Sequence, residues 1–184
     1  MPPQQLYLSS AFKPRTEHGG SLRAGRRKLA RPVDPKKPLH IVLRSERARG
    51  KWSLLHPKNK IRVHILVERY AERFGVRVYR FSNVGNHIHL LVKAPTREAF
   101  RSFLRALAGG IAFAVTGAKK RNPVGRFWSS LAYTRVLRWG QEFKRVQLYL
   151  VKNLLESLGV FEGCEQKSGL RLSSVTGAPR PIRP

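Results

Sequence analysis

Hydrophobic residues between positions 38 and 160 recur with the period of an α-helix in three stretches. Two of them show the spacing i, i+3, i+4, i+7, i+11: Val63, Leu66, Val67, Tyr70 and Phe74, then Phe100, Phe103, Leu104, Leu107 and Ile111. Gly75 is placed to end the first helix, and Pro95-Thr96 precedes the second. A third helix is predicted over residues 141–158, with Phe143, Val146, Leu150 and Leu154 on its apolar face.

Four further stretches have the length and β-branched or alternating composition of strands. They cover residues 39–44, 76–81, 87–92 and 127–137, and a turn around Val84-Gly85-Asn86 joins the middle two as a hairpin or meander. The predicted order is therefore β-α-β-β-α-β followed by a helix. That order indicates an α+β, ferredoxin-like domain, an antiparallel sheet with two helices on one face and a third helix at the C-terminal end.

The two ends of the chain lack such patterning. Residues 1–37 carry Gly19-Gly20, several prolines and the basic residues Arg26, Arg27 and Lys28, and we interpret them as a flexible basic arm that contacts phosphates. Residues 161–184 are predicted to be a C-terminal tail. The folded domain is expected to span residues 38–160.

The charge of the chain points to a polyanionic partner. Lys and Arg number 37 against 10 acidic residues, a net charge of +27. Nucleic acid is the first expectation and an anionic membrane surface the second, although no run of 18 apolar residues predicts a spanning helix. A basic ribosome-associated protein would explain the charge equally well. The single cysteine, Cys164, and an N-terminus without signal-peptide features favour a cytoplasmic, bacterial nucleoid location.

His87 and His89 stand one residue apart on a predicted strand, so both imidazoles point to the same face. Such a pair can bind one divalent metal ion, although two polar residues on a solvated face would give the same pattern. A metal needs at least a third ligand, and neither cysteine nor clustered acids stand near the motif. The missing ligand is therefore expected to be an amide or another histidine.

Tyr149 and Asn153 lie four residues apart on the predicted last helix and therefore share one side of it. The phenolic oxygen is a possible nucleophile and the amide oxygen a possible metal ligand. Together with the histidine pair they fit phosphoryl transfer on DNA, in which a tyrosine attacks a phosphodiester and conserves the bond as a phosphotyrosine. Each residue alone would otherwise be an ordinary polar position on a helix surface.

Residues 86–92 (NHIHLLV) resemble the His-hydrophobe-His (HUH) motif of the single-tyrosine transposases, especially the branch associated with repetitive extragenic palindromes. Residues 39–44 (LHIVLR) are similar to the first strand of that family. Residues 126–130 (RFWSS) with Tyr133 are similar to the strand before its last helix, and residues 149–153 (YLVKN) to its nucleophile helix. The resemblance covers residues 39–160 in the same order.

The resemblance implies roles for individual residues. His87, His89 and Asn153 would bind Mg²⁺ or Mn²⁺, and Tyr149 would form a 5′-phosphotyrosine on single-stranded DNA near a hairpin. Many relatives place proline after this asparagine, where this chain has Leu154. A catalytically inactive, domesticated nucleic-acid-binding protein on the same fold remains the alternative, and monomer and homodimer both remain open.

Four more residues are candidates around the site. Arg44 and Arg80 are expected to contact DNA phosphates, in addition to the basic arm. Trp52, in a basic loop, is the tryptophan expected to stack on a base. His40, on the first predicted strand, is a candidate neighbour of the metal site.

Overall fold

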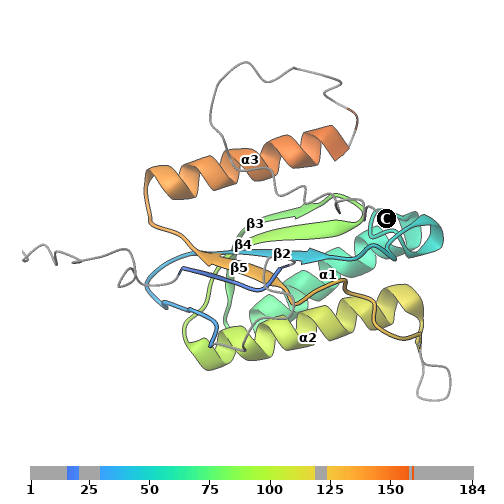
Figure 1. The fold of residues 1–184 in the computed structure, drawn as a ribbon, viewed down its shortest axis with the longest axis horizontal. Helices are drawn as coiled ribbons and strands as arrows, with labels where there is room; N and C mark the ends of the chain where they lie inside the picture. Colours follow the sequence, from blue (N-terminus) through green and yellow to red (C-terminus); the bar gives the residue numbers. More distant parts are fainter. Residues whose placement is uncertain (1–15, 21–29, 119–123, 158, 160–184) are drawn as a thin grey trace, which may run out of the picture.

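The computed structural model describes residues 16–20, 30–118, 124–157 and 159 of the chain. Its centre is an antiparallel five-stranded sheet in the order β1-β5-β2-β4-β3 (Figure 1). The strands are β1 (Glu17–His18), β2 (Leu39–Arg44), β3 (Arg77–Asn83), β4 (His87–Lys93) and β5 (Tyr133–Val136). The four predicted strands take the order β5-β2-β4-β3, which confirms the ferredoxin-like α+β fold.

The helices cover the two faces of the sheet unequally. Helices α1 (Pro57–Arg73) and α2 (Arg97–Thr116) lie together on one face, and α3 (Gln141–Ser157) lies alone on the other (Figure 1). All three predicted helices are confirmed, and a 3₁₀ turn, η3 (Gly50–Trp52), precedes α1. At the predicted ends, Thr96 caps α2 by accepting a hydrogen bond from Ala99 N, and Gly75 follows α1 with φ of 61°.

Side-chain alternation along β2 and β4 separates the hydrophobic core from the candidate chemistry. Leu39, Ile41 and Leu43 of β2 pack under α1 and α2 with Ile88, Leu90 and Val92 of β4. The intervening residues His40, His87 and His89 therefore face α3. A shift of one residue in either strand would exchange the two sets, so burial of the aliphatic face fixes where the histidines point.

The α3 side of the sheet has only a small apolar cluster. Leu91, Leu137 and Leu150 are fully buried there, with Tyr79, Phe143 and Val146 packed around them. At the start of α3, Glu142 accepts hydrogen bonds from Arg135 Nη2 at 2.7 Å and from Arg138 N at 2.8 Å. Few contacts therefore hold α3 against the sheet.

The predicted strand over residues 127–137 is wrong in its length, because only Tyr133–Val136 is a strand. The residues before it bond elsewhere. Ser129 N donates to Arg44 O at 2.9 Å, and the Trp128 indole donates to Ala108 O in α2 at 2.8 Å. Because these groups bond to the end of β2 and to α2, residues 127–132 lie outside the regular hydrogen bonding of the sheet.

The segment predicted to be a flexible arm is partly built into the fold. Glu17 and His18 pair with β5 as strand β1, and Arg31 Nη1 donates to Ala132 O at 2.8 Å and to Thr134 Oγ1 at 2.5 Å. The expectation of a wholly flexible arm over 1–37 is thus corrected for residues 16–20 and 30–37. Arg26, Arg27 and Lys28 lie outside the described residues, as does the tail over 161–184.

Candidate functional site

The predicted histidine pair and the predicted tyrosine meet between β4 and α3. The rings of His87 and His89 stand edge to face with centroids 4.7 Å apart. The ring of Tyr149 stands edge to face with His89 at 5.9 Å, and its side chain remains half-exposed. The nucleophile candidate therefore adjoins the histidines of its own chain and stays accessible from outside.

A neighbouring side chain fixes the orientation of the His87 ring. His87 Nδ1 lies 2.6 Å from the amide oxygen of Asn86, a geometry in which Nδ1 carries the proton and donates it. The other nitrogen, Nε2, then keeps its lone pair. This is the tautomer that a metal-binding histidine requires.

His89 has a ring contact of its own, with His40. His40 Nε2 lies 3.2 Å from His89 Nδ1, and the two rings stack with centroids 5.4 Å apart. His89 Nε2 is buried and has no hydrogen-bond partner among the described residues. A buried polar nitrogen without a partner is costly, and a bound cation would satisfy it.

Burial keeps these imidazoles neutral at physiological pH. Desolvation, with repulsion from His40 and His87, lowers the pKa of His89 to about 3. Desolvation, with repulsion from Arg135, lowers the pKa of His40 to about 4. Desolvation and the nearby Arg44 also lower the pKa of His87. Neutral imidazole is the form that binds metal, so the residues present fit a divalent cation.

The third ligand must come from another residue type. Within the described part of the chain, no three His, Cys, Asp or Glu side chains form a group that could hold a metal. Asn153 lies one turn after Tyr149 on α3 and is half-buried, and its side chain makes no hydrogen bond to the described residues. Its amide stays the candidate third ligand by its place on the helix.

Ser82 is a site neighbour that the sequence prediction missed. It pairs directly with His89 across β3 and β4. Its side chain is fully buried, and its hydroxyl has no hydrogen-bond partner among the described residues. Counting back from the predicted turn over residues 84–86 would have placed Phe81 opposite His89. In the structure Val84 N donates to His87 O at 3.0 Å, which closes a two-residue loop and puts Ser82 in that place.

The other predicted residues are distributed around this site. Arg44 is exposed at the end of β2 and pairs with His87, whereas Arg80 is exposed on β3 and pairs with Leu91. Trp52 packs instead against the core under α1 and α2, with the Arg47 guanidinium 5.0 Å from its ring. Trp52 is therefore not brought to the histidines.

Comparison with solved structures finds the same fold. The chain is similar to a REP-associated tyrosine transposase bound to a REP hairpin, with a TM-score of 0.52, 9% identity and coverage of 71% of this chain and 73% of that one. A protein from Deinococcus radiodurans R1, provisionally named a transposase, gives a TM-score of 0.43 at 19% identity, covering 69% of this chain and 97% of that one. No curated protein matches the chain.

A protein-family model matches the sequence directly. The model described as IS200-like transposase matches residues 36–147, which include β2 to β5 and the first seven residues of α3. The match contains His40, His87 and His89 and ends two residues before Tyr149. Because the matched region covers more than half of the chain and contains the histidine pair, this protein belongs to the IS200-like transposase family.

Proposed function

We propose that this transposase is a metal-dependent endonuclease and strand transferase for single-stranded DNA, acting near DNA hairpins through a 5′-phosphotyrosine. The observation that carries the proposal is the contact of Tyr149 with His89, whose buried Nε2 has no partner in the described chain. The hairpin part of the substrate comes from the structural relative, which is bound to a REP hairpin.

The reaction is a transesterification. Tyr149 Oη forms a bond to the scissile phosphorus, the bond from phosphorus to the 3′ oxygen breaks, and the departing strand leaves with a 3′-hydroxyl. The phenol proton passes to solvent or to the departing oxygen, and the reverse attack by another 3′-hydroxyl releases the tyrosine. The energy of the phosphodiester is conserved in the phosphotyrosine, so no nucleotide cofactor is needed.

His87 and His89 would hold the metal through their Nε2 atoms, with Asn153 as the third ligand. When bound, Mg²⁺ or Mn²⁺ would withdraw charge from a non-bridging phosphate oxygen and orient the phosphate for in-line attack. With the metal bound, Asn86 would accept the Nδ1 proton of His87 and His40 would accept the Nδ1 proton of His89. Arg44, exposed beside His87, supplies a positive charge for the DNA backbone.

The experiment is covalent trapping on a hairpin-bearing single strand. The full chain with Mn²⁺ should form an adduct, stable in denaturing gels, with the strand carrying the 5′ phosphate, and Tyr149→Phe should form none because it lacks the phenolic oxygen. Tyr79→Phe, which alters a tyrosine of the apolar cluster, is the matched control. An adduct formed by Tyr149→Phe would refute the nucleophile, and no adduct with the unmodified chain across a panel of palindromic strands would support the inactive alternative.

The metal role is tested separately with the double variant His87→Ala/His89→Ala. It should lose cleavage and keep salt-sensitive DNA binding, since the arginines that contact phosphate are unchanged. Cleavage retained in this variant would refute metal binding by the two histidines.

A further inference from the structure

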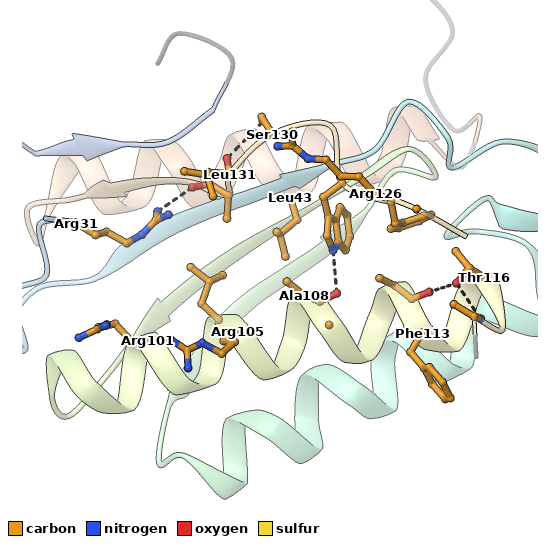
Figure 2. Close-up of a pocket in the computed structure, with 18 of the residues that line it drawn as sticks. Arg31, Leu43, Arg101, Arg105, Ala108, Phe113, Thr116, Arg126, Ser130 and Leu131 are labelled. Atoms are coloured by element: carbon orange, nitrogen blue, oxygen red, sulfur yellow. Dashed lines mark hydrogen bonds between the residues drawn. The ribbon is translucent and has the colours of Figure 1, made fainter. Parts of the chain in front are cut away.

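A groove of about 720 Å³ lies on the side of the sheet opposite to the histidines, between α2 and the segment 125–132 (Figure 2). Its volume is within the range of pockets that bind organic ligands, roughly 300–1,000 Å³. The Trp128 indole, bonded to Ala108 O across it, joins the two walls at one point. The chemistry described above uses no residue of this groove.

The walls of the groove are apolar. The side of α2 towards the groove contributes Leu104, Ala108 and Ala112, and the opposite segment contributes Trp128 and Leu131. Phe113 lies at the margin of the groove and points away from that segment (Figure 2). Phe113 and Leu131 are 63% and 62% exposed, although both are large hydrophobic side chains. The exposed Leu131 and the partly exposed Trp128 leave apolar surface uncovered on the wall opposite α2.

The rim of the groove is basic. Arg31, Arg101, Arg105 and Arg126 line it, and none of the described residues that line it is acidic. Arg101, Arg105 and Arg126 are exposed and form no ion pair within the described part of the chain. Figure 2 shows Arg101 and Arg105 on α2 and Arg126 on the opposite wall. The groove therefore offers uncommitted guanidinium groups beside apolar surface.

The far wall of the groove leads to the histidine site. Ser129 N donates to Arg44 O, and Ser45 Oγ donates to Phe127 O at 2.5 Å, so this wall is attached to the end of β2. At that end, Arg44 pairs with His87 of β4. A chain-like ligand in the groove could thus continue around one end of the sheet towards Tyr149.

We propose that this groove binds an unpaired segment of the DNA substrate, with bases against its apolar walls and phosphates on its arginines. Single strands expose both bases and phosphates, whereas a duplex presents mainly phosphates to such a surface. The inference deepens the proposed function and rests on it for the identity of the substrate. It assigns the groove a binding role and no part in the chemical step.

A lipid surface fits these features less well. By length and composition alone, α2 is apolar enough to cross a membrane. Three of its large apolar side chains, Phe100, Phe103 and Leu107, are fully buried in the core under the sheet, and among its phenylalanines Phe113 alone is exposed. Leu104, Ala108 and Ala112 line a groove that has arginines on both walls, and a flat bilayer would not enter it.

The test measures binding of a fluorescent ten-nucleotide thymidine oligomer, which cannot form a hairpin, to the full chain by anisotropy. Arg101→Gln/Arg105→Gln should weaken binding by about tenfold and lower the salt slope by one to two phosphate contacts. Arg62→Gln/Arg69→Gln, which removes two exposed charges from α1, is the matched control and should change affinity by less than about threefold.

Gly109→Leu tests the shape of the groove without changing its charge. A Cβ at this groove position meets no atom within 4 Å, so the side chain can enter the groove without a clash, and the helix itself should gain stability. The variant should weaken oligomer binding by about tenfold while the net charge stays the same. The proposal would be overturned if both groove variants bound the oligomer within twofold of the affinity of the unmodified chain. It would also be overturned if the variants weakened binding to anionic phosphatidylserine vesicles and not binding to the oligomer.

The two proposals fail in different ways. If the groove variants weaken oligomer binding but no tyrosine adduct forms, the proposed enzyme activity is refuted and the proposed binding role of the groove is supported. If the adduct forms but neither groove variant changes oligomer binding, the proposed enzyme activity is supported and the proposed binding role of the groove is refuted.

Discussion

His40 shows how one buried side chain can control the chemistry of another. Its Nε2 is the partner of His89 Nδ1, and the two residues stand diagonally across β2 and β4. If His89 Nε2 binds the metal, His89 Nδ1 must carry the proton, and His40 must accept it. His40 is thus a positioning residue, while His89 would be the ligand.

We expect His40→Ala to lower the affinity for Mn²⁺ by roughly 10- to 100-fold, because the buried Nδ1 proton of His89 loses its acceptor. His40→Gln, whose amide oxygen can accept the same proton, should recover part of that loss. Calorimetric titration with Mn²⁺ measures both. His64→Ala is the control, since His64 is exposed on α1 and contacts Glu68. Equal Mn²⁺ affinity in His40→Ala and the unmodified chain would contradict the positioning role.

At the scale of an element, α3 is attached less firmly than α1 and α2. It rests on the small cluster around Leu91, Leu137 and Leu150, whereas the other two helices share the main core. An additional anchor lies at the first turn of α3, where Glu142 accepts hydrogen bonds from Arg135 and from Arg138 N. The helix that carries Tyr149 can therefore open without loss of the sheet.

Leu150→Ala should reveal this local opening. Removing a fully buried leucine side chain costs roughly 2–5 kcal/mol, here taken mainly from the docking of α3. Hydrogen exchange should accelerate in α3 and remain slow in β2 and β4, and adduct formation should fall. Leu107→Ala in α2 is the matched control and should accelerate exchange throughout the domain. Uniform exchange changes in Leu150→Ala would contradict the separate stability of α3.

At the scale of the whole molecule, one chain brings together His87, His89 and Tyr149. Tyr149 contacts His89 of its own chain. A mixture of Tyr149→Phe with His87→Ala/His89→Ala should therefore form no adduct, because neither chain carries a full site. Adduct formation in the mixture would show that two chains exchange their tyrosine helices. Each variant assayed alone, and the unmodified chain, provide the reference values.

The buried histidines also make the stability of the whole domain depend on pH. In the unfolded chain their pKa is about 6.5, whereas burial lowers it in the folded state to about 4 for His40 and about 3 for His89. Between these values the unfolded chain binds more protons, so stability is fully present above pH 6.5 and falls as pH falls towards 4. The slope is on the order of 1.4 kcal/mol per pH unit for each histidine.

Urea unfolding at pH 7.5 and pH 5 tests this dependence. The unmodified chain should have a lower midpoint at pH 5, and His40→Gln/His89→Gln should lose most of the difference because neither glutamine titrates. His56→Gln/His64→Gln, which changes two histidines outside the buried pair, should keep it. An unchanged midpoint in the unmodified chain would contradict neutral burial of the two imidazoles.

Much of this architecture is local and could be predicted from the sequence alone. Helical and strand periods identified α1, α2, α3 and the strands β2 to β4, because the periodicity of side chains is set by backbone geometry. The pair His87 and His89 could be assigned to one face for the same reason. The net charge of +27 favoured a polyanionic partner before any contact was known.

Other features depend on contacts between residues distant in sequence, which only the tertiary structure decides. Strand β1 and the anchoring of Arg31 exist because β5 offers an open edge, and residues 127–132 leave the ladder because α2 and β2 take their hydrogen bonds. Ser82 and His40 become neighbours of His89 through strand register. The groove along α2 arises where one side of this helix lies opposite the segment 125–132. Periodicity specifies which way a side chain points, whereas packing decides what it meets.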